Sequence, residues 1–429
     1  MIMGGMPSGD VLKYANLGAI IPLNDLLDQY APELKSWMDK LPEIEKTLVY
    51  PDGNIYYFPM LDEYPTGNNP LTIRQDWLEK LSMESPVTND DWYNYWKAVK
   101  EQDPNENGKQ DEIPFSGNGI GSARSLIVGW GVLDGFYSDP KDDGKIHYGP
   151  IEDRYREGLE WVSKAYEEGL IDPEIATNDE KAFQGKMAQN LVGSYRGAFG
   201  GNMVTFNSSL SKEIPGFRVI GTAPMKGPHG EQIHPSLDQN PRNGAIGAVI
   251  TKENKYPEET VKWIDYFYSP EGATLVNMGI EGKHYTMVNG VPKFTDLVLK
   301  NPDGLSPKQV VGTYSFAQGA GPFLFMKAQG EGLDDEAVKE TKAKYISPFI
   351  EESKKYVLPG TLPFDDADDQ ERLQIMADIQ TYVDESIIKF IIGQEPLDRW
   401  DAYVEKVKDM NIDRVIDIYQ KAFDAWNNK

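Results

Sequence analysis

Hydrophobic and polar positions alternate along the first 365 residues in a way that predicts strands and helices in turn. Short apolar runs at 112–117 ("EIPFSG") and 190–197 ("NLVGSYRG") predict buried strands. The segments 74–81 ("RQDWLEKL") and 88–102 repeat their apolar residues every three or four positions, which predicts amphipathic helices. This alternation is typical of the α/β class and predicts parallel sheets flanked by helices.

Two local signals add detail to this pattern. Thr88, followed three residues later by Asp91, predicts a capping box at the start of a helix. The turn 51–53 ("PDG") lies between apolar runs and predicts a hairpin over 48–60.

The pattern changes near residue 365, and the rest of the chain predicts helices alone. Gly393 ends the longest of them, because glycine readily takes the left-handed backbone that closes a helix. Two further helical segments follow at 396–410 and 412–426. The apolar residues of the long helix recur at three- and four-residue spacing: Leu373, Met376, Ile379, Val383, Ile387 and Ile391.

Length, composition and charge limit the classes of protein that fit. The chain has 429 residues, 40% of them hydrophobic and 26% charged, which predicts a folded protein of two domains. Its net charge of -25 argues against nucleic acid and a bare anionic membrane surface as partners, because both repel such a surface. Cysteine is absent, which excludes disulfides, thiolate metal sites and cysteine nucleophiles.

The sequence contains neither a membrane span nor an export signal that we recognise. No apolar run reaches the roughly 20 residues that a membrane helix needs. The first residues, "MIMGGMPSGD", lack the basic start and the apolar core of a signal peptide. We expect further sequence upstream of Met1.

The stretch 101–115, "EQDPNENGKQDEIPF", predicts a metal-binding loop. Counted from Asp103, oxygen-bearing side chains fall at positions 1, 3, 5 and 9 with glycine at position 6, as in the front half of an EF-hand loop. Position 12 is Pro114, so Glu112 has to supply the bidentate carboxylate. The predicted ligands are the side chains of Asp103, Asn105, Asn107, Asp111 and Glu112, with the backbone carbonyl of Lys109.

Oxygen ligands without histidine or cysteine favour Ca²⁺ over zinc or copper. All positions of this loop are occupied by protein groups, so we expect a structural calcium site that joins a helix to a strand and not a catalytic centre. The alternative is a solvated polar turn without metal.

Catalytic motifs are hard to find. None of the four histidines stands in an H-E-x-x-H arrangement, and the chain has no G-x-S-x-G elbow. The glycine-rich segment 117–125 lacks the lysine of a phosphate-binding loop and reads as a flexible connection. The acidic run 364–371 ("FDDADDQE") contains paired carboxylates that a glycoside hydrolase needs. It is better explained as the charged first turn of the long helix that follows.

Aromatic and polar residues in loops favour sugar binding. The chain has nine Trp and 23 Tyr, and sugars bind through flat aromatic faces with polar groups at the ring edge. Trp161, Trp263, Trp400 and Trp426 lie at helical spacing with other apolar residues, so we expect them in the core. The candidate ligand-binding residues, beside predicted strand ends, are Asp62, Tyr64, Asn68, Arg74, Trp130, Tyr195, Arg196, Asn240, Arg242, His284 and Tyr285.

Four motifs, taken in order, resemble a known family. They are "NPLTIRQDWLEKL", "DPNENGKQDEIPF", "AVITKENKYPEETVKWIDYFYSPEGATLVNMGIEGKHY" and "IIKFIIGQEPLDRWDAYVEKVKDMNIDRVIDIYQKAF". The chain resembles, from its first residues to its last, the family 1 extracellular solute-binding proteins, and especially the LipO-type lipoproteins that serve ABC importers of oligosaccharides. The resemblance implies a two-lobed periplasmic-binding-protein type II fold, each lobe a sheet flanked by helices, with a helical C-terminus. It also supports calcium, since alginate-binding relatives carry a D-x-N-x-N-G-x-x-D-E loop.

The resemblance implies a division into lobes that close on the ligand. The first lobe is expected to take residues 1–113 and 245–310, the second 116–240 and 315–429, with hinges near 113–117, 241–245 and 310–315.

The implied function is capture of an oligosaccharide between the lobes and its delivery to permease subunits in the membrane, without catalysis. We expect a monomer at the outer face of the membrane, anchored by lipid in the full-length protein, or in the periplasm of a Gram-negative cell. Family members usually begin with a lipobox cysteine and further structure before the residues that match "MIMGG", so we expect an N-terminal truncation. The alternatives are a glycoside hydrolase or lyase acting in the same cleft, and a receptor for a non-sugar ligand such as a peptide.

Overall fold

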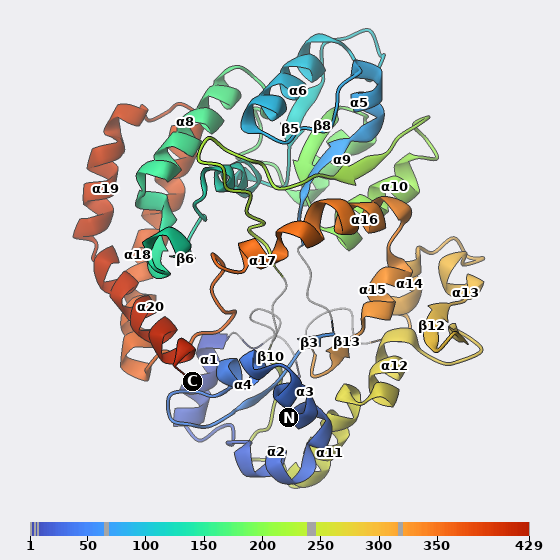
Figure 1. Cartoon of the computed structure of the whole chain (residues 1–429), viewed down its shortest axis with the longest axis vertical. Helices are drawn as coiled ribbons and strands as arrows, with labels where there is room; N and C mark the ends of the chain where they lie inside the picture. The colour runs from blue at the N-terminus through green and yellow to red at the C-terminus, as the bar shows by residue number, and fades with distance from the viewer. Residues whose placement is uncertain are drawn as a thin grey trace.

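The computed structural model describes residues 2, 3, 6, 8–63, 68–237, 246–315 and 321–428. Two bodies lie one above the other in Figure 1, and each is built around its own apolar core. The larger core, in the part that we call the large lobe, gathers buried residues from 71–233 and 337–415. The smaller core, in the small lobe, draws on 11–61, 246–273 and Leu324.

The small lobe is a three-stranded antiparallel sheet, ordered β1-β10-β2, with helices packed around it. A second, two-stranded sheet pairs β3 and β13 in parallel. The helices bury one face each: Leu27, Leu34 and Ile44 are all in the core. The elements are β1 (Ile2–Met3), α1 (Ser8–Asn16), α2 (Asn24–Tyr30), α3 (Pro32–Lys40), α4 (Pro42–Leu48), β2 (Tyr57–Pro59), β3 (Leu61–Asp62), β10 (Ile246–Val249), α11 (Pro257–Asp265), η5 (Tyr266–Tyr268), α12 (Pro270–Met278) and β13 (Leu324–Phe325).

An extension of the small lobe, beyond α12, has a small core of its own. Its buried residues include Met278, Phe294 and Val311. The Asn289-Gly290 pair turns the hairpin with positive φ at both positions, 52° and 78°, as two-residue hairpin loops prefer. The elements are β11 (Tyr285–Val288), β12 (Val291–Phe294), α13 (Asp296–Leu299), α14 (Pro307–Gly312) and α15 (Lys327–Leu333).

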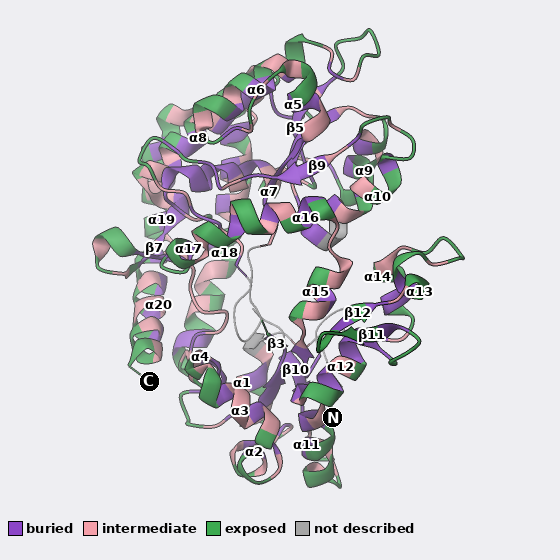
Figure 2. Ribbon diagram, turned by 45° about the vertical axis from the view of Figure 1, so that its right-hand side comes forward, coloured by how far each residue is buried: buried purple, intermediate pink, exposed green. Residues whose placement is uncertain are grey.

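The large lobe is a four-stranded mixed sheet in the order β5-β8-β4-β9. Only β5 and β8 are parallel in it, because β4 runs antiparallel to both β8 and β9. Figure 2 shows β5 and β9 almost wholly buried beneath surrounding helices. The elements are β4 (Leu71–Arg74), α5 (Gln75–Leu81), α6 (Asn89–Glu101), β5 (Ile113–Ser116), α7 (Ile120–Arg124), η1 (Ser125–Trp130), β6 (Phe136–Asp139), β7 (Lys145–Tyr148), α8 (Asp153–Glu167), α9 (Glu180–Ala188), β8 (Val192–Arg196), α10 (Val204–Leu210) and β9 (Val219–Gly221).

Helices complete the large lobe at its C-terminal side. One face of the longest, α18, adds Ile379, Val383 and Ile387 to the large core. Its neighbour α20 runs down toward α4 of the small lobe (Figure 1), where Trp426 Nε1 donates a 3.2 Å hydrogen bond to Thr47 Oγ1. The elements are α16 (Glu336–Thr341), α17 (Ile350–Ser353), α18 (Asp366–Ile391), α19 (Trp400–Asp409) and α20 (Ile412–Asn427).

Short 3₁₀ and π turns link several of these elements. In the described part of the chain, no helix has both the length and the apolar character to cross a membrane. The bounds of the remaining turns are η2 (Pro140–Asp142), η3 (Gly149–Ile151), η4 (Phe199–Met203), η6 (Lys342–Ile346), η7 (Ser347–Phe349) and η8 (Leu397–Arg399).

Most of the local predictions are confirmed. Helices form at α5, α6 and α18, strands at β5 and β8, and Thr88 with Asp91 makes the complete capping box. The expectation of parallel sheets is wrong for most strand pairs, since six of the eight pairs among the described residues are antiparallel. The 51–53 turn forms, but its strand β2 pairs with the distant β10 and not with a local partner.

The expected lobe boundaries need correction. Residues 71–99, placed in the first lobe with 1–113, belong to the large core, because Trp77, Trp92 and Trp96 pack there with Phe115. The expected crossing at 310–315 is also wrong, since Val310 and Val311 lie in the core of the extension. The chain passes between the lobes after Leu61, after Ile233 and after Leu333, and the expected hinge at 241–245 lies outside the described residues.

Asn277 fastens α12 to β13. Its side chain is fully buried, and Nδ2 donates to the carbonyls of Leu324 and Ala273, both at 2.8 Å. Its Oδ1 accepts from the backbone N–H of Met326 at 3.0 Å. Asn277 therefore satisfies backbone groups of β13 and of the residue that follows it.

Replacing Asn277 with Ala removes the side chain that pairs with the Leu324 carbonyl and the Met326 N–H, so we expect the free energy of unfolding to fall by about 1–3 kcal/mol. Chemical denaturation measures the change. Glu271→Ala, an exposed change in the same helix, is the control and should have little effect. Equal stabilities for the two variants would contradict this role of Asn277.

Candidate ligand and metal sites

The acidic loop at 103–112 connects the end of α6 to the start of β5 in the large lobe. Three of its residues take a left-handed backbone: Asp103 with φ 46°, Glu106 with φ 59° and Gly108 with φ 77°. Such conformations are unfavourable for residues other than glycine. The side chains of the loop must therefore stabilise its shape.

They do so by turning their oxygens inward. The Asp103 carboxylate accepts the backbone N–H groups of Asn107 at 3.1 Å and of Gly108 at 2.9 Å. The Asn107 Oδ1 accepts the N–H of Lys109 at 2.8 Å, and the Asn105 Oδ1 that of Asn107 at 2.9 Å. Asp111 Oδ1 accepts from the Asn107 amide at 2.9 Å. The structure thus brings the predicted metal-binding side chains together in one loop.

Glu112 is the residue that a cation would explain best. It is 8% exposed, and neither carboxylate oxygen has a hydrogen-bond partner among the described residues. Burial is the largest cause that raises the pKa of Glu112; the Asp103 carboxylate also raises it, and the nearby backbone N–H groups of Glu112 and Asn105 oppose the rise. The described residues contain no cluster of three or more His, Cys, Asp or Glu side chains that could hold a metal ion. Asparagine and backbone oxygens would have to complete the shell, as they do in calcium loops.

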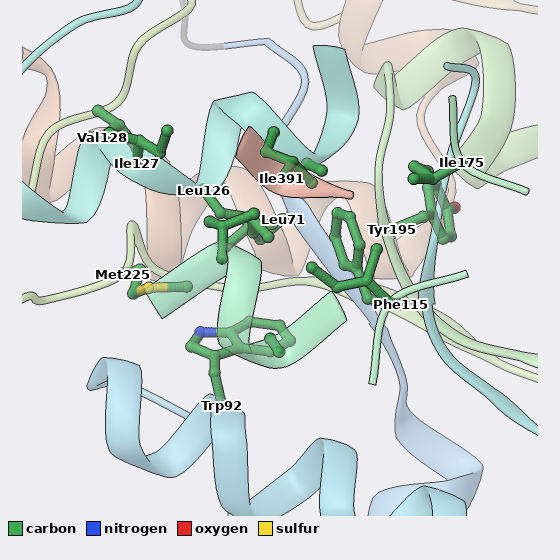
Figure 3. Packing of buried hydrophobic residues seen from close by; sticks show 14 of the residues in the cluster. Leu71, Trp92, Phe115, Leu126, Ile127, Val128, Ile175, Tyr195, Met225 and Ile391 are labelled. Atoms are coloured by element: carbon green, nitrogen blue, oxygen red, sulfur yellow. The ribbon is translucent and has the colours of Figure 1, made fainter. Parts of the chain in front are cut away.

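Two aromatic residues that the sequence places at the ligand lie instead in the large core. Trp130 is 3% exposed and Tyr195 1%. The ring of Trp130 packs directly on α8, where a Cβ added at Gly158 would come within 3.1 Å of it. Tyr195 lies beside Phe115 among the core side chains of Figure 3. The prediction that these two rings contact a sugar is therefore wrong, because α8 covers Trp130, and Phe183 and Phe206 pack against Tyr195.

Arg74 is also buried, and its contacts are internal. Its Nε and Nη2 bind both oxygens of Asp76 at 2.8 and 2.6 Å, and its Nη1 binds Asn190 Oδ1 at 2.7 Å. The guanidinium lies over the rings of Trp77 and Phe217. Because its donors bind Asp76 and Asn190, the Arg74 guanidinium holds β4 in place. The predicted contact of Arg74 with ligand is therefore wrong.

His284 and Tyr285 lie at the extension. The imidazole of His284 stacks on Tyr314 with ring centroids 4.0 Å apart, and its Nδ1 accepts from the backbone N–H of Ile280 at 3.1 Å. Tyr285 is buried in the extension's core. Asp62 is buried in β3, which pairs with β13. His284 and Tyr285 therefore support the extension of the small lobe.

Arg196 is the predicted site residue with the most unusual surroundings. Its Nη1 donates to the carbonyl of Asn69 at 3.0 Å and its Nη2 to that of Ser125 at 3.4 Å, and no carboxylate pairs with it among the described residues. Burial lowers the pKa of Arg196 to about 10. The adjacent Asn68 donates its backbone N–H to Ser236 at 2.9 Å. Arg196 thus marks the place where two chain segments leave the large lobe.

His234 lies near Arg196, and the sequence gives no sign of its role. It is 2% exposed, and neither ring nitrogen has a hydrogen-bond partner in the described part of the chain. Burial, with the positive charge of Arg196, lowers the pKa of His234 to about 3, so the ring is neutral. A single histidine without a motif gives no sequence signal. Of the remaining predicted residues, Tyr64, Asn240 and Arg242 lie outside the described residues.

A pocket of 340 Å³ lies between the two lobes. The small lobe contributes the turn after α4, and the large lobe contributes the start of α18 and the end of α20. A larger hollow of 690 Å³ beside Trp400 lies within the large lobe alone, so a ligand there would not touch both lobes. The inter-lobe pocket is lined by Val49, Tyr50, Pro51, Gly53, Pro363, Phe364, Asp365, Asp368, Ile418, Lys421, Ala422 and Ala425.

The family follows from comparison with known proteins. The model of the bacterial extracellular solute-binding protein family matches residues 2–274, more than half of the chain. The chain belongs to this family. A fructooligosaccharide ABC transporter substrate-binding protein, FusA of Streptococcus pneumoniae serotype 4, is 29% identical over 98% of this chain and 79% of FusA. Lipoprotein LipO of Bacillus subtilis is 25% identical over 74% of this chain and 64% of LipO.

Solved structures agree with this assignment. The alginate-binding protein AlgQ2, solved without calcium ion, superposes with a TM-score of 0.80 at 30% identity, covering 97% of this chain and 84% of that chain. FusA in complex with kestose gives a TM-score of 0.75 at 25% identity, covering 98% and 86%. The predicted resemblance and the two-lobed fold are therefore confirmed for this solute-binding protein.

The buried ion pair at Arg74 gives a direct test of its structural role. In this solute-binding protein, Arg74→Ala would strand Asp76, whose side chain is 10% exposed. We expect the free energy of unfolding to fall by about 3–5 kcal/mol, as for other buried pairs that lose one partner. Arg156→Ala is the matched control, because Arg156 pairs with Glu160 at the surface, and it should cost less than about 1 kcal/mol. Denaturant titration compares the two, and similar losses would refute the assignment.

Proposed function

We propose that the chain is the substrate-binding component of an ABC importer and that it carries an oligosaccharide between its two lobes. The observation that carries this proposal is the end-to-end match in fold to FusA, whose solved complex holds kestose. The inter-lobe pocket supports it, because a ligand there would touch both lobes and favour their closed arrangement. Permease subunits in the membrane are the partners that follow, with the binding protein acting as a monomer.

No catalysis is part of this proposal. The relatives are binding proteins, and Asp365 and Asp368, the carboxylates of the acidic run that line the pocket, both bind Lys421. Carboxylates held in ion pairs are poor general acids, since the ammonium favours their charged form. The site of action is extracellular, as the family description states, and a lipid anchor like that named for LipO would hold the full-length protein at the membrane.

Titration calorimetry tests the proposal. A set of neutral oligosaccharides (kestose, maltotriose and xylotriose) and acidic ones (trigalacturonate and trimannuronate) is titrated into the protein. We expect at least one to bind, with no shortened product on long incubation. Cleaved sugar would favour a glycoside hydrolase or lyase. Absence of binding by every sugar, in a protein that melts cooperatively, would overturn the oligosaccharide proposal.

We further propose that the loop at 103–112 binds Ca²⁺ as a structural ion. The proposed ligands are Asp103, Asn105, Asn107, Asp111 and Glu112, together with the carbonyl of Lys109, and the buried, unpaired Glu112 carboxylate supports them. Two similar proteins also support calcium, because FusA has been solved as an EF-hand mutant and AlgQ2 without calcium ion. The ion would neutralise the close carboxylates and join α6 to β5.

Calcium should stabilise the wild-type protein and not the Asp103→Ala variant. A ligand that binds only the folded state adds about 2.7 kcal/mol at 100 times its Kd. Melting curves in chelator and in millimolar calcium measure this gain. Unchanged melting of the wild type would show that the loop is only a turn.

Glu112→Gln separates the ion from the fold. Because burial raises the pKa of Glu112, its ionised form costs stability at neutral pH, and the cost disappears as the pH falls below the ordinary pKa of glutamate. In chelator at neutral pH we expect the variant to melt higher than the wild type, and in calcium we expect it to lose the calcium gain. Glu106→Gln, an exposed change in the same loop, is the control. A lower melting temperature of Glu112→Gln in chelator would contradict the unpaired carboxylate.

A further inference from the structure

The chemistry of the inter-lobe pocket bears on which sugars it accepts. Its small-lobe wall is a fixed turn: Tyr50 N–H donates to the Asn54 carbonyl at 2.9 Å, and Gly53, at φ 81°, accepts from the Asn24 amide at 3.0 Å. Tyr50 is 6% exposed, and its hydroxyl has no hydrogen-bond partner among the described residues. Hydrogen bonds thus fix this wall, and the Tyr50 hydroxyl remains without a partner among the described residues.

The apolar part of the lining suits the carbon face of a sugar ring. Phe364 and Pro363 come from the large lobe, and Pro51 faces them across the pocket from the small lobe. The ring of Phe364 is held by the guanidinium of Arg372, 4.1 Å from its centroid, and by the edge of Tyr419. A ring fixed in this way loses little freedom when a ligand packs on it.

The charged groups of the lining are two carboxylates and one ammonium. Lys421 contacts Asp365 and binds Asp368 at 2.8 Å. The hydrogen bond to Lys421 is the first cause that lowers the pKa of Asp368, which therefore stays ionised. Carboxylate oxygens have room for several donors each, so both can still accept from hydroxyl groups.

Three cations at or beside the lining in the described part of the chain, Lys421, Arg414 and Arg372, are already paired with carboxylates. Lys421 binds two carboxylates. Arg414 binds Asp368 at 3.0 Å and Glu371 at 2.6 Å, and Arg372 binds Asp369. A uronate carboxylate entering here would meet two carboxylates, Asp365 and Asp368, against the single ammonium of Lys421. The net negative charge of this lining disfavours it by like-charge repulsion.

From this arrangement we propose that the pocket is a subsite for one uncharged sugar unit and that it selects neutral over acidic oligosaccharides. The inference rests on the proposed function and adds to it the chemical class of the ligand. Asp365 and Asp368 accept sugar hydroxyls, and Phe364, Pro363 and Pro51 pack against the apolar face of the ring. Since the walls come from different lobes, the bound unit holds the lobes together.

Blocking the pocket tests its location. Ala425 is exposed on α20 and lines the pocket, so Ala425→Trp should fill it without disturbing a core. We expect neutral sugars to bind at least about tenfold more weakly, a change of about 1.4 kcal/mol. Ala402→Trp, at an exposed alanine of α19 outside the pocket, is the control and should bind as the wild type does. Melting curves of both variants confirm that they fold.

Removing a carboxylate tests the chemistry. Asp365→Ala should also weaken binding of neutral sugars about tenfold, as expected for a hydrogen bond to a charged group. Asp366→Ala is matched to it, because Asp366 is the next residue at the start of α18 and does not line the pocket. Equal affinities of these two variants would overturn the role of Asp365.

The outcomes separate this inference from the proposed function. Neutral sugars that bind the wild type, and lose affinity in Ala425→Trp and Asp365→Ala only, support it. Binding that Ala425→Trp leaves unchanged, or tighter binding of trigalacturonate than of every neutral sugar, overturns the subsite while the oligosaccharide function stands. Failure of all the sugars to bind overturns both.

Discussion

The structure depends on the separation of its two apolar cores. Each lobe buries its own side chains, and the chain passes between them after Leu61, after Ile233 and after Leu333. Apolar burial is the largest favourable term in folding, so each lobe can be stable on its own. Polar groups on the surfaces between the lobes are then not needed in either core and stay available to bind a ligand. This division permits a solute-binding protein to keep a site between its lobes.

One candidate site lies within a single lobe, and the other lies between the two lobes. The loop at 103–112 lies within the large lobe, next to α6 and β5, and any ion there would strengthen one lobe alone. The pocket beside Tyr50 and Lys421 has walls from both lobes. An occupant that touches both lobes would favour the arrangement to which it binds more tightly, because a ligand shifts an equilibrium by its different affinity for the two states.

Several residues show where reasoning from the sequence succeeds and where it fails. Local signals such as the capping box at Thr88 and the spacing in α18 were correct, since their physics acts within a few residues. Positions in loops beside predicted strand ends suggested that the rings of Trp130 and Tyr195 face a ligand, and both are buried. Whether such a ring faces solvent depends on which distant element covers it, and for Trp130 that element is α8.

The sequence by itself determined the α/β class, the family, the helical C-terminus and the grouping of oxygen-bearing residues at 103–112, because each is encoded by spacing or motif within a continuous segment. Only the tertiary structure decided the lobe boundaries, the burial of Arg74 with Asp76, and the pocket between 49–53 and 363–425. These features join residues that are distant in the chain. Their contacts depend on how the side chains of both cores pack and on where the chain crosses between the lobes. A local sequence pattern contains neither piece of information.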